Sequence, residues 1–174
     1  LVWRTNEGFN VQPLYRGVDI KDLKATDSLP GEYPFVRGTR TNNDWGVRQN
    51  ICVENVAEAN DKARTLLTKG VTSLGFKLCK VEDVDLKALL ACIDLTKIEI
   101  NLMCCPKCVV DYTTKLVEIV KSAGAAESFK GSVNFNPFKR QLKHGVAFPG
   151  DIIAISKELL EVAKDVKGLK LFTV

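Results

Sequence analysis

The sequence predicts an α/β protein in which an extended arm precedes alternating helices and parallel strands. Two observations support this class. Residues 1–50 hold both tryptophans, two of the three tyrosines and most of the turn signals, which is typical of ordered loops rather than regular structure. From residue 55 onward, amphipathic stretches alternate with short β-branched runs. Such alternation favours a parallel sheet whose strands are connected by helices.

Capping residues and glycines predict where the helices begin and end. Asn55 has the side chain of an N-cap, and Gly70 is placed to end the helix that follows it. Pro106 suits the first turn of a helix, where a missing N–H leaves no bond unmade. We therefore expect four helices, after Asn55, after Asp83 or Asp85, from Pro106 and after Asp151, and four strands, at residues 71–78, 98–103, 132–136 and 169–174.

Composition argues against several functional classes. The net charge of +4 is spread over interspersed signs, so nucleic acid is a poor default partner. No run approaches 18 consecutive apolar residues, so we expect no membrane span. The six cysteines are irregularly spaced, unlike a secreted disulfide framework, which favours a reducing cytoplasm. Neither common glycine-rich phosphate loop is present.

The C-x-x-C motif formed by Cys105 and Cys108 is the sharpest chemical candidate. Between a strand and a helix N-terminus it has the placement of a thioredoxin-like dithiol, where the helix dipole favours a thiolate at Cys105. The alternative is that small, soft residues simply line the rim of a strand. A structural zinc needs four ligands, which one such motif and one histidine do not supply.

Other polar candidates have both a functional and a structural interpretation. His144, the only histidine, is a candidate general acid or base, but a structural role near a strand-to-helix loop is favoured. Arg37, Arg40 and Arg48 match phosphate oxygens in geometry. The alternative, which a small non-catalytic subunit would favour, is that they fix the arm by hydrogen bonding to carbonyls and carboxylates.

Residues 30–49 read PGEYPFVRGTRTNNDWGVRQ. This run resembles the loop before the first barrel strand of methylmalonyl-CoA mutases, where a Pro-Gly turn leads through PF-x-RG to W-x-x-RQ. Catalytic chains of that family insert a longer segment with a T-M-Y tripeptide, whereas this chain has only residues 39–44 there. The departure is similar to the small, non-catalytic subunit of the bacterial heterodimeric enzymes. The matching positions are Pro34, Phe35, Arg37, Gly38, Trp45, Arg48 and Gln49.

For the fold, the resemblance implies an extended arm at residues 1–54 and the first half of a (β/α)8 TIM-type barrel at residues 55–174, with four strands and four helices. GVTSLGFKL resembles the first barrel strand, GSVNFNPFKRQLKHG the third strand with its loop, and LKLFTV the fourth strand. Four strands do not close a barrel, so the chain is expected to be the N-terminal piece of a longer protein. Several bulky strand residues are candidates to point into the barrel, and they predict a barrel interior too full to admit CoA. These residues are Leu74, Phe76, Leu102, Phe135 and Phe172.

For function, the resemblance implies the small subunit of adenosylcobalamin-dependent methylmalonyl-CoA mutase, an isomerase of methylmalonyl-CoA and succinyl-CoA. The cofactor is expected on a larger partner subunit of a heterodimer, because the D-x-H-x-x-G cobalamin motif is absent here. Compared with catalytic mutase chains, the resemblance implies that the substrate-binding positions are degenerate here. His144 replaces an Arg that contributes to binding the acyl-CoA. Asn134, two residues after Ser132, replaces a Gln in the binding region. We expect no catalytic, cofactor or metal residue on this chain.

Two alternatives stay open: a catalytic acyl-CoA mutase fragment with an altered substrate, and a thioredoxin-like dithiol oxidoreductase that uses Cys105 and Cys108. Unpaired strand edges also predict self-association of the isolated chain. We expect a cytoplasmic location and neither a nucleic acid nor a membrane as partner.

Overall fold

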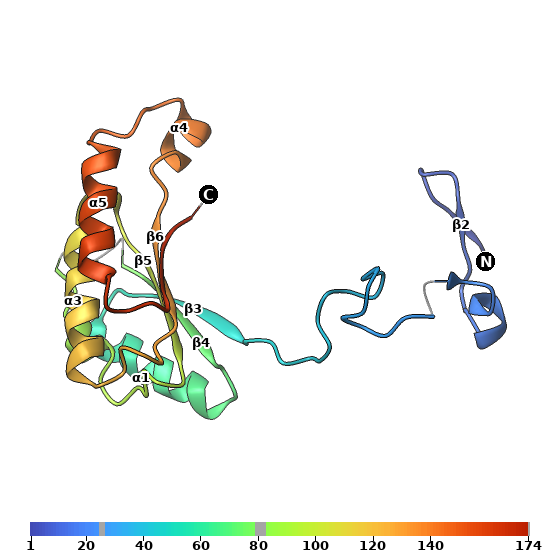
Figure 1. Ribbon diagram of the computed structural model, residues 1–174, viewed down its shortest axis with the longest axis horizontal. Helices are drawn as coiled ribbons and strands as arrows, with labels where there is room; N and C mark the ends of the chain where they lie inside the picture. The colour runs from blue at the N-terminus through green and yellow to red at the C-terminus, as the bar shows by residue number, and fades with distance from the viewer. Residues whose placement is uncertain (25–26, 79–82, 174) are drawn as a thin grey trace. The chain divides into compact units, whose positions relative to one another are not determined.

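The computed structural model describes residues 1–24, 27–78 and 83–173. The chain divides into two compact units, Leu1–Trp45 and Gly46–Val174 (Figure 1). Among the described residues, no helix is long and apolar enough to cross a membrane.

The first unit contains little regular structure. Strands β1 (Trp3–Arg4) and β2 (Asn10–Val11) pair antiparallel, and the short 3-10 helix η1 (Gly17–Ile20) follows. None of its described residues is buried. The unit is therefore held by local turns rather than by a core.

Hydrogen-bonded turns order the part of this unit that carries the family-like motif. The Gly31 N–H donates to the Gly38 carbonyl at 2.9 Å. Gly31 has a φ of +83°, and a Cβ there would lie 2.5 Å from Thr41 Cγ2, so the turn requires glycine. The Arg40 guanidinium donates to the Asp44 carbonyl at 3.3 Å. This contact matches the structural interpretation of the arm arginines.

The second unit is built on a five-stranded parallel sheet. The strands are neighbours in the order in which they occur in the chain. A doubly wound sheet would reverse its order at a switch point, whereas unbroken chain order is that of part of an α/β barrel. The predicted fold class is confirmed. The strands are β3 (Arg48–Cys52), β4 (Ser73–Lys77), β5 (Glu99–Met103), β6 (Gly131–Phe135) and β7 (Leu169–Phe172).

The predicted helix caps form as expected. The Asn55 side chain accepts a hydrogen bond from the Glu58 N–H, and the Asp151 carboxylate accepts from the amides of Ile153 and Ala154. Figure 1 shows α3 and α5 side by side against the sheet. The helical elements are α1 (Val56–Thr68), α2 (Leu86–Leu89), the 3-10 turn η3 (Pro106–Cys108), α3 (Val109–Ser122), α4 (Lys139–His144) and α5 (Ile152–Ala163).

The sequence-based count of four strands and four helices differs from the structure. Strand β3 lies inside the range 1–54 that was assigned to the arm; only Ile51 in it is buried, so it carries no alternating pattern. Helix α4 is six residues long, too short to show helical periodicity. Helix α2 ends at Leu89, and Cys92 beyond it has a φ of 61°, which an α-helix does not accommodate.

One face of the sheet packs under the helices and forms the core. Ile51, Phe76, Leu102 and Val133 stand in register across β3 to β6, and each is at most 2% exposed. They belong to one apolar cluster with helix residues such as Leu116. Because side chains alternate along a strand, this register fixes which residues lie on the opposite face.

The C-terminal ends of the parallel strands lie at one edge of the sheet. The Leu78 N–H donates to the Met103 carbonyl at 2.9 Å, and Asn136 directly follows β6. Val174, the last residue of the strand expected at 169–174, lies outside the described residues.

We predict unequal costs for two phenylalanine truncations in this sheet. Phe76→Ala removes a fully buried ring and should lower the free energy of unfolding by about 3–5 kcal/mol. Phe172→Ala, at a side chain that is 46% exposed, should cost about 1 kcal/mol or less. Urea unfolding of the full chain measures both values. Equal costs would contradict the assignment of the core to the Phe76 face.

Candidate functional site

The face of the sheet opposite the helices is lined by small and polar side chains. Asn50, Gly75, Asn101, Ser132 and Lys170 occupy consecutive register positions from β3 to β7. Gly75 leaves room for the Asn50 side chain, because a Cβ there would lie 2.1 Å from Asn50 Oδ1 and that side chain would have to move. This polar face corresponds to the interior of a barrel.

Three of its side chains form a hydrogen-bonded row, Ser73–Asn101–Ser132. The Asn101 amide donates to Ser73 Oγ at 3.1 Å, and the Ser132 hydroxyl donates to Asn101 Oδ1 at 2.6 Å. Asn101 is only 1% exposed, so its amide depends on these partners. The row ties β4, β5 and β6 together on the polar face.

The expectation of a bulky interior is wrong for most of the residues on which it was based. Leu74, Phe76, Leu102 and Phe135 are buried in the apolar cluster under the helices. The odd-numbered residues of β4 and β5, not the even-numbered ones, face the interior. The steric argument that these side chains would exclude CoA therefore does not hold.

A cavity of about 420 Å³ opens at the C-terminal ends of β5 and β6. It brings together Cys105 and His144, which the sequence indicated separately. Neither Ser132 nor Asn134 lines it; both lie on β6, further back along the strand. The cavity, called the strand-end cavity below, is lined by Cys105, Pro106, Asn136, Lys139, Lys143 and His144.

The two lysines of the strand-end cavity are not among the site residues that the sequence predicted. Lys139 and Lys143 are four residues apart on α4 and thus share a helix face. That spacing was the available signal, but a helix this short was not recognised. Among the described residues that line the cavity there are two lysines and no carboxylate, so this lining favours an anionic ligand.

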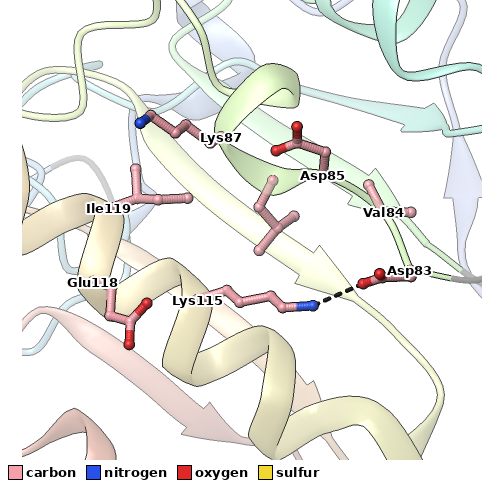
Figure 2. A pocket seen from close by; sticks show the side chains of 8 residues that line it. Asp83, Val84, Asp85, Lys87, Lys115, Glu118 and Ile119 are labelled. Carbon is pink, nitrogen blue, oxygen red and sulfur yellow. Dashed lines mark hydrogen bonds and ion pairs between the residues drawn. The ribbon is translucent and has the colours of Figure 1, made fainter.

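A second hollow, of about 460 Å³, lies between α3 and the segment that leads into α2. Figure 2 shows Lys115 reaching from α3 toward Asp83. The two atoms Lys115 Nζ and Asp83 Oδ1 are 2.8 Å apart, and Asp111 Oδ2 lies 3.0 Å from the same nitrogen. The lysine is already paired, so we assign this contact a structural role.

The pair shifts the ionisation of both partners. The hydrogen bond from Lys115, and then its charge, lower the pKa of Asp83 below the ordinary 3.8. Hydrogen bonds to Asp83 and Asp111 raise the pKa of Lys115. Asp83 is exposed and Lys115 is partly exposed, so solvent screens the interaction.

Comparison with known proteins gives consistent matches. A family model described as methylmalonyl-CoA mutase matches residues 4–83. The chain is 50% identical over 178 residues to the methylmalonyl-CoA mutase small subunit of Porphyromonas gingivalis. This match covers all of this chain and 29% of that relative. Over 78 residues it is 35% identical to the methylmalonyl-CoA mutase large subunit of Streptomyces virginiae and 37% identical to the methylmalonyl-CoA mutase of Escherichia coli; each match covers 42% of this chain and 11% of the relative.

The fold and the polar sheet face define part of an α/β-barrel protein with a hydrophilic interior. The chain belongs to the methylmalonyl-CoA mutase family, as the run at residues 30–49 predicted. Its match to a small subunit extends over the whole chain, whereas the matches to the large subunit and to the Escherichia coli mutase cover less than half of it. The chain spans less than a third of the small subunit that it matches.

We predict that Asn101→Leu destabilises the sheet, although the two side chains have the same branched arrangement of heavy atoms. Leucine leaves Ser73 and Ser132 without their amide partner, and burying unmet polar groups costs about 1–3 kcal/mol. Asn42→Leu, at an exposed position in the first unit, serves as the control and should change stability by about 0.5 kcal/mol or less. The midpoint of urea unfolding measures both. An Asn101→Leu protein as stable as the parent would contradict the role of the row.

We also predict that Lys115→Met raises the pKa of Asp83 toward 3.8. A carboxyl whose pKa is depressed stabilises the fold above its unfolded pKa, and this contribution is lost as pH falls through the depressed value. The variant should therefore lose less stability than the parent in that acid range. Carboxyl NMR titration measures the shift.

Asp94 is the internal control for that titration. Hydrogen bonds from the Thr96 hydroxyl and amide, and then from Lys97, lower the pKa of Asp94, so it should not change in Lys115→Met. A shift of both carboxyls would indicate a global change, and no shift at Asp83 would contradict the pairing.

Proposed function

We propose that this chain forms the N-terminal part of the small subunit of an adenosylcobalamin-dependent methylmalonyl-CoA mutase, the isomerase of methylmalonyl-CoA and succinyl-CoA. The observation that carries the proposal is the 50% identity to a small subunit across the whole chain. In this proposal the chain supports a larger catalytic subunit and is inactive by itself.

The substrate-equivalent positions support a non-catalytic role. The Ser132 hydroxyl donates to Asn101 and is thus committed within the sheet. His144 stands where the family resemblance implies an arginine, and an imidazole cannot make the bidentate contact of a guanidinium. We propose that Ser132, Asn134 and His144 are a degenerate substrate site.

The residues of this chain do not fit cobalamin held through a histidine ligand. His144 shares the strand-end cavity with two lysines, and the described lining residues include no carboxylate that could orient its imidazole toward a metal. The D-x-H-x-x-G motif is also absent. We therefore assign adenosylcobalamin, which supplies the radical chemistry when bound, to the larger subunit.

The first unit, Leu1–Trp45, is proposed as the main contact with that larger subunit. Its aromatic side chains are exposed to a degree unusual for their size: Trp3 67%, Tyr33 85% and Trp45 60%. Tryptophan and tyrosine are the residues on which interfaces most depend. The open edges of β3 and β7 offer a further surface for assembly or for self-association. A cytoplasmic location, proposed from the irregular cysteine spacing, is part of the same assignment.

We predict that Trp45→Ala weakens binding to the co-expressed larger subunit about 30-fold, the effect of losing an interface residue worth about 2 kcal/mol. Leu160→Ala on α5, at a side chain of similar exposure (55%), is the matched control and should change binding less than about twofold. Titration of the purified subunits by calorimetry measures both. Neither substitution should lower the melting temperature of the isolated chain, because both side chains are exposed.

Two results would contradict the proposal in different ways. Equal binding by Trp45→Ala and the parent would contradict the arm as the contact surface. Mutase activity or cobalamin binding by the chain alone would contradict its supporting role.

A further inference from the structure

We propose that Cys105 and Cys108 form a reversible dithiol–disulfide site in the connection between β5 and α3. The backbone already holds the two cysteines at the ends of one turn, because the Cys108 N–H donates to the Cys105 carbonyl at 3.0 Å. Residues closing such a turn have Cα atoms within about 7 Å. Disulfides join Cα atoms about 4.4–6.8 Å apart, a separation that the two ends of such a turn can reach.

The site is selective among the described cysteines. Cys105 and Cys108 are both exposed, whereas the adjacent Cys104 is 9% exposed on the core side. Cys52 lies on β3, and Cys92 follows α2. Within the described part of the chain, one pair of exposed thiols therefore shares a turn.

The strand-end cavity distinguishes the two thiols. Cys105 lines it beside Lys139, Lys143 and His144, and Cys108 does not. The lysines attract the carboxylates of an anionic low-molecular-weight disulfide, of which glutathione disulfide is the probe used below. We therefore assign Cys105 as the attacking thiol and Cys108 as the resolving thiol.

The chemistry balances in two exchange steps. The Cys105 thiolate attacks one sulfur of the small disulfide, forming a mixed disulfide and releasing one thiolate. The Cys108 thiolate then attacks Cys105 Sγ, closing the protein disulfide and releasing the second thiolate. The protein dithiol loses two electrons and two protons, and the small disulfide becomes two thiols.

Oxidation would change the strand-end cavity directly. The cavity loses the free thiol of Cys105, and the turn that opens α3 becomes covalently closed. The redox state of the surroundings would thereby set the chemistry of a cavity at the C-terminal edge of the sheet. This inference does not rest on the proposed subunit role.

The test uses the 174-residue chain with Cys52, Cys79 and Cys92 replaced by serine, so that Cys104, which is buried, is the one cysteine left beside the pair. The reduced protein is treated with glutathione disulfide, alkylated with N-ethylmaleimide and mapped by peptide mass spectrometry. We expect Cys105 and Cys108 to lose alkylation together, with a linked peptide two hydrogen masses lighter, and to recover it with dithiothreitol. Retention of both thiols under these conditions would overturn the proposal.

Single variants test the assigned roles. Cys108→Ser should trap glutathione on Cys105, and Cys105→Ser should form the adduct on Cys108 several-fold more slowly. Replacing Lys139 and Lys143 by glutamine should slow the reaction of glutathione disulfide but not that of neutral hydroxyethyl disulfide. Equal adduct rates at the two cysteines, or equal slowing with both reagents, would overturn the role of the cavity.

Discussion

The separation of the sheet into an apolar and a polar face is the constraint on which the rest of the second unit depends. Ile51, Phe76, Leu102 and Val133 share one register under the helices. Since strand side chains alternate, that register places Gly75, Asn101 and Ser132 on the other face. A slip of one residue would bury the polar row and expose the core. Packing under the helices therefore fixes the chemistry of the barrel interior.

Much of the fold could be predicted because local signals agree with the tertiary structure. The N-caps Asn55, Asp85 and Asp151 all accept the expected amide hydrogen bonds. The orientation of β4 could not be predicted, because Ser73 to Phe76 are all buried and the hydrophobic alternation that distinguishes the faces is lost. β3 was missed for the opposite reason, since four of its five residues are exposed.

The candidate site was predicted in its parts but not as an assembly. Cys105 and His144 were each recognised, yet only the parallel pairing of β5 with β6 brings the segments that follow these strands to one edge. The lysines beside them lie on a helix of six residues, below the length at which periodicity is visible. A site formed by strand ends is specified by topology, which no local pattern in this sequence encodes.

The two units differ in how much burial offsets the entropic cost of ordering their backbones. Ordering a backbone residue costs about 1–2 kcal/mol, and the second unit offsets this by burying a continuous core. None of the described residues in Leu1–Trp45 is buried, so its turns and few backbone hydrogen bonds must offset that cost alone. Covering Trp3, Tyr33 and Trp45 would add about 25 cal/mol for each Å² of apolar surface removed from water. A contact surface for another subunit would supply that burial, which is why the arm, rather than the sheet, carries the proposed interface.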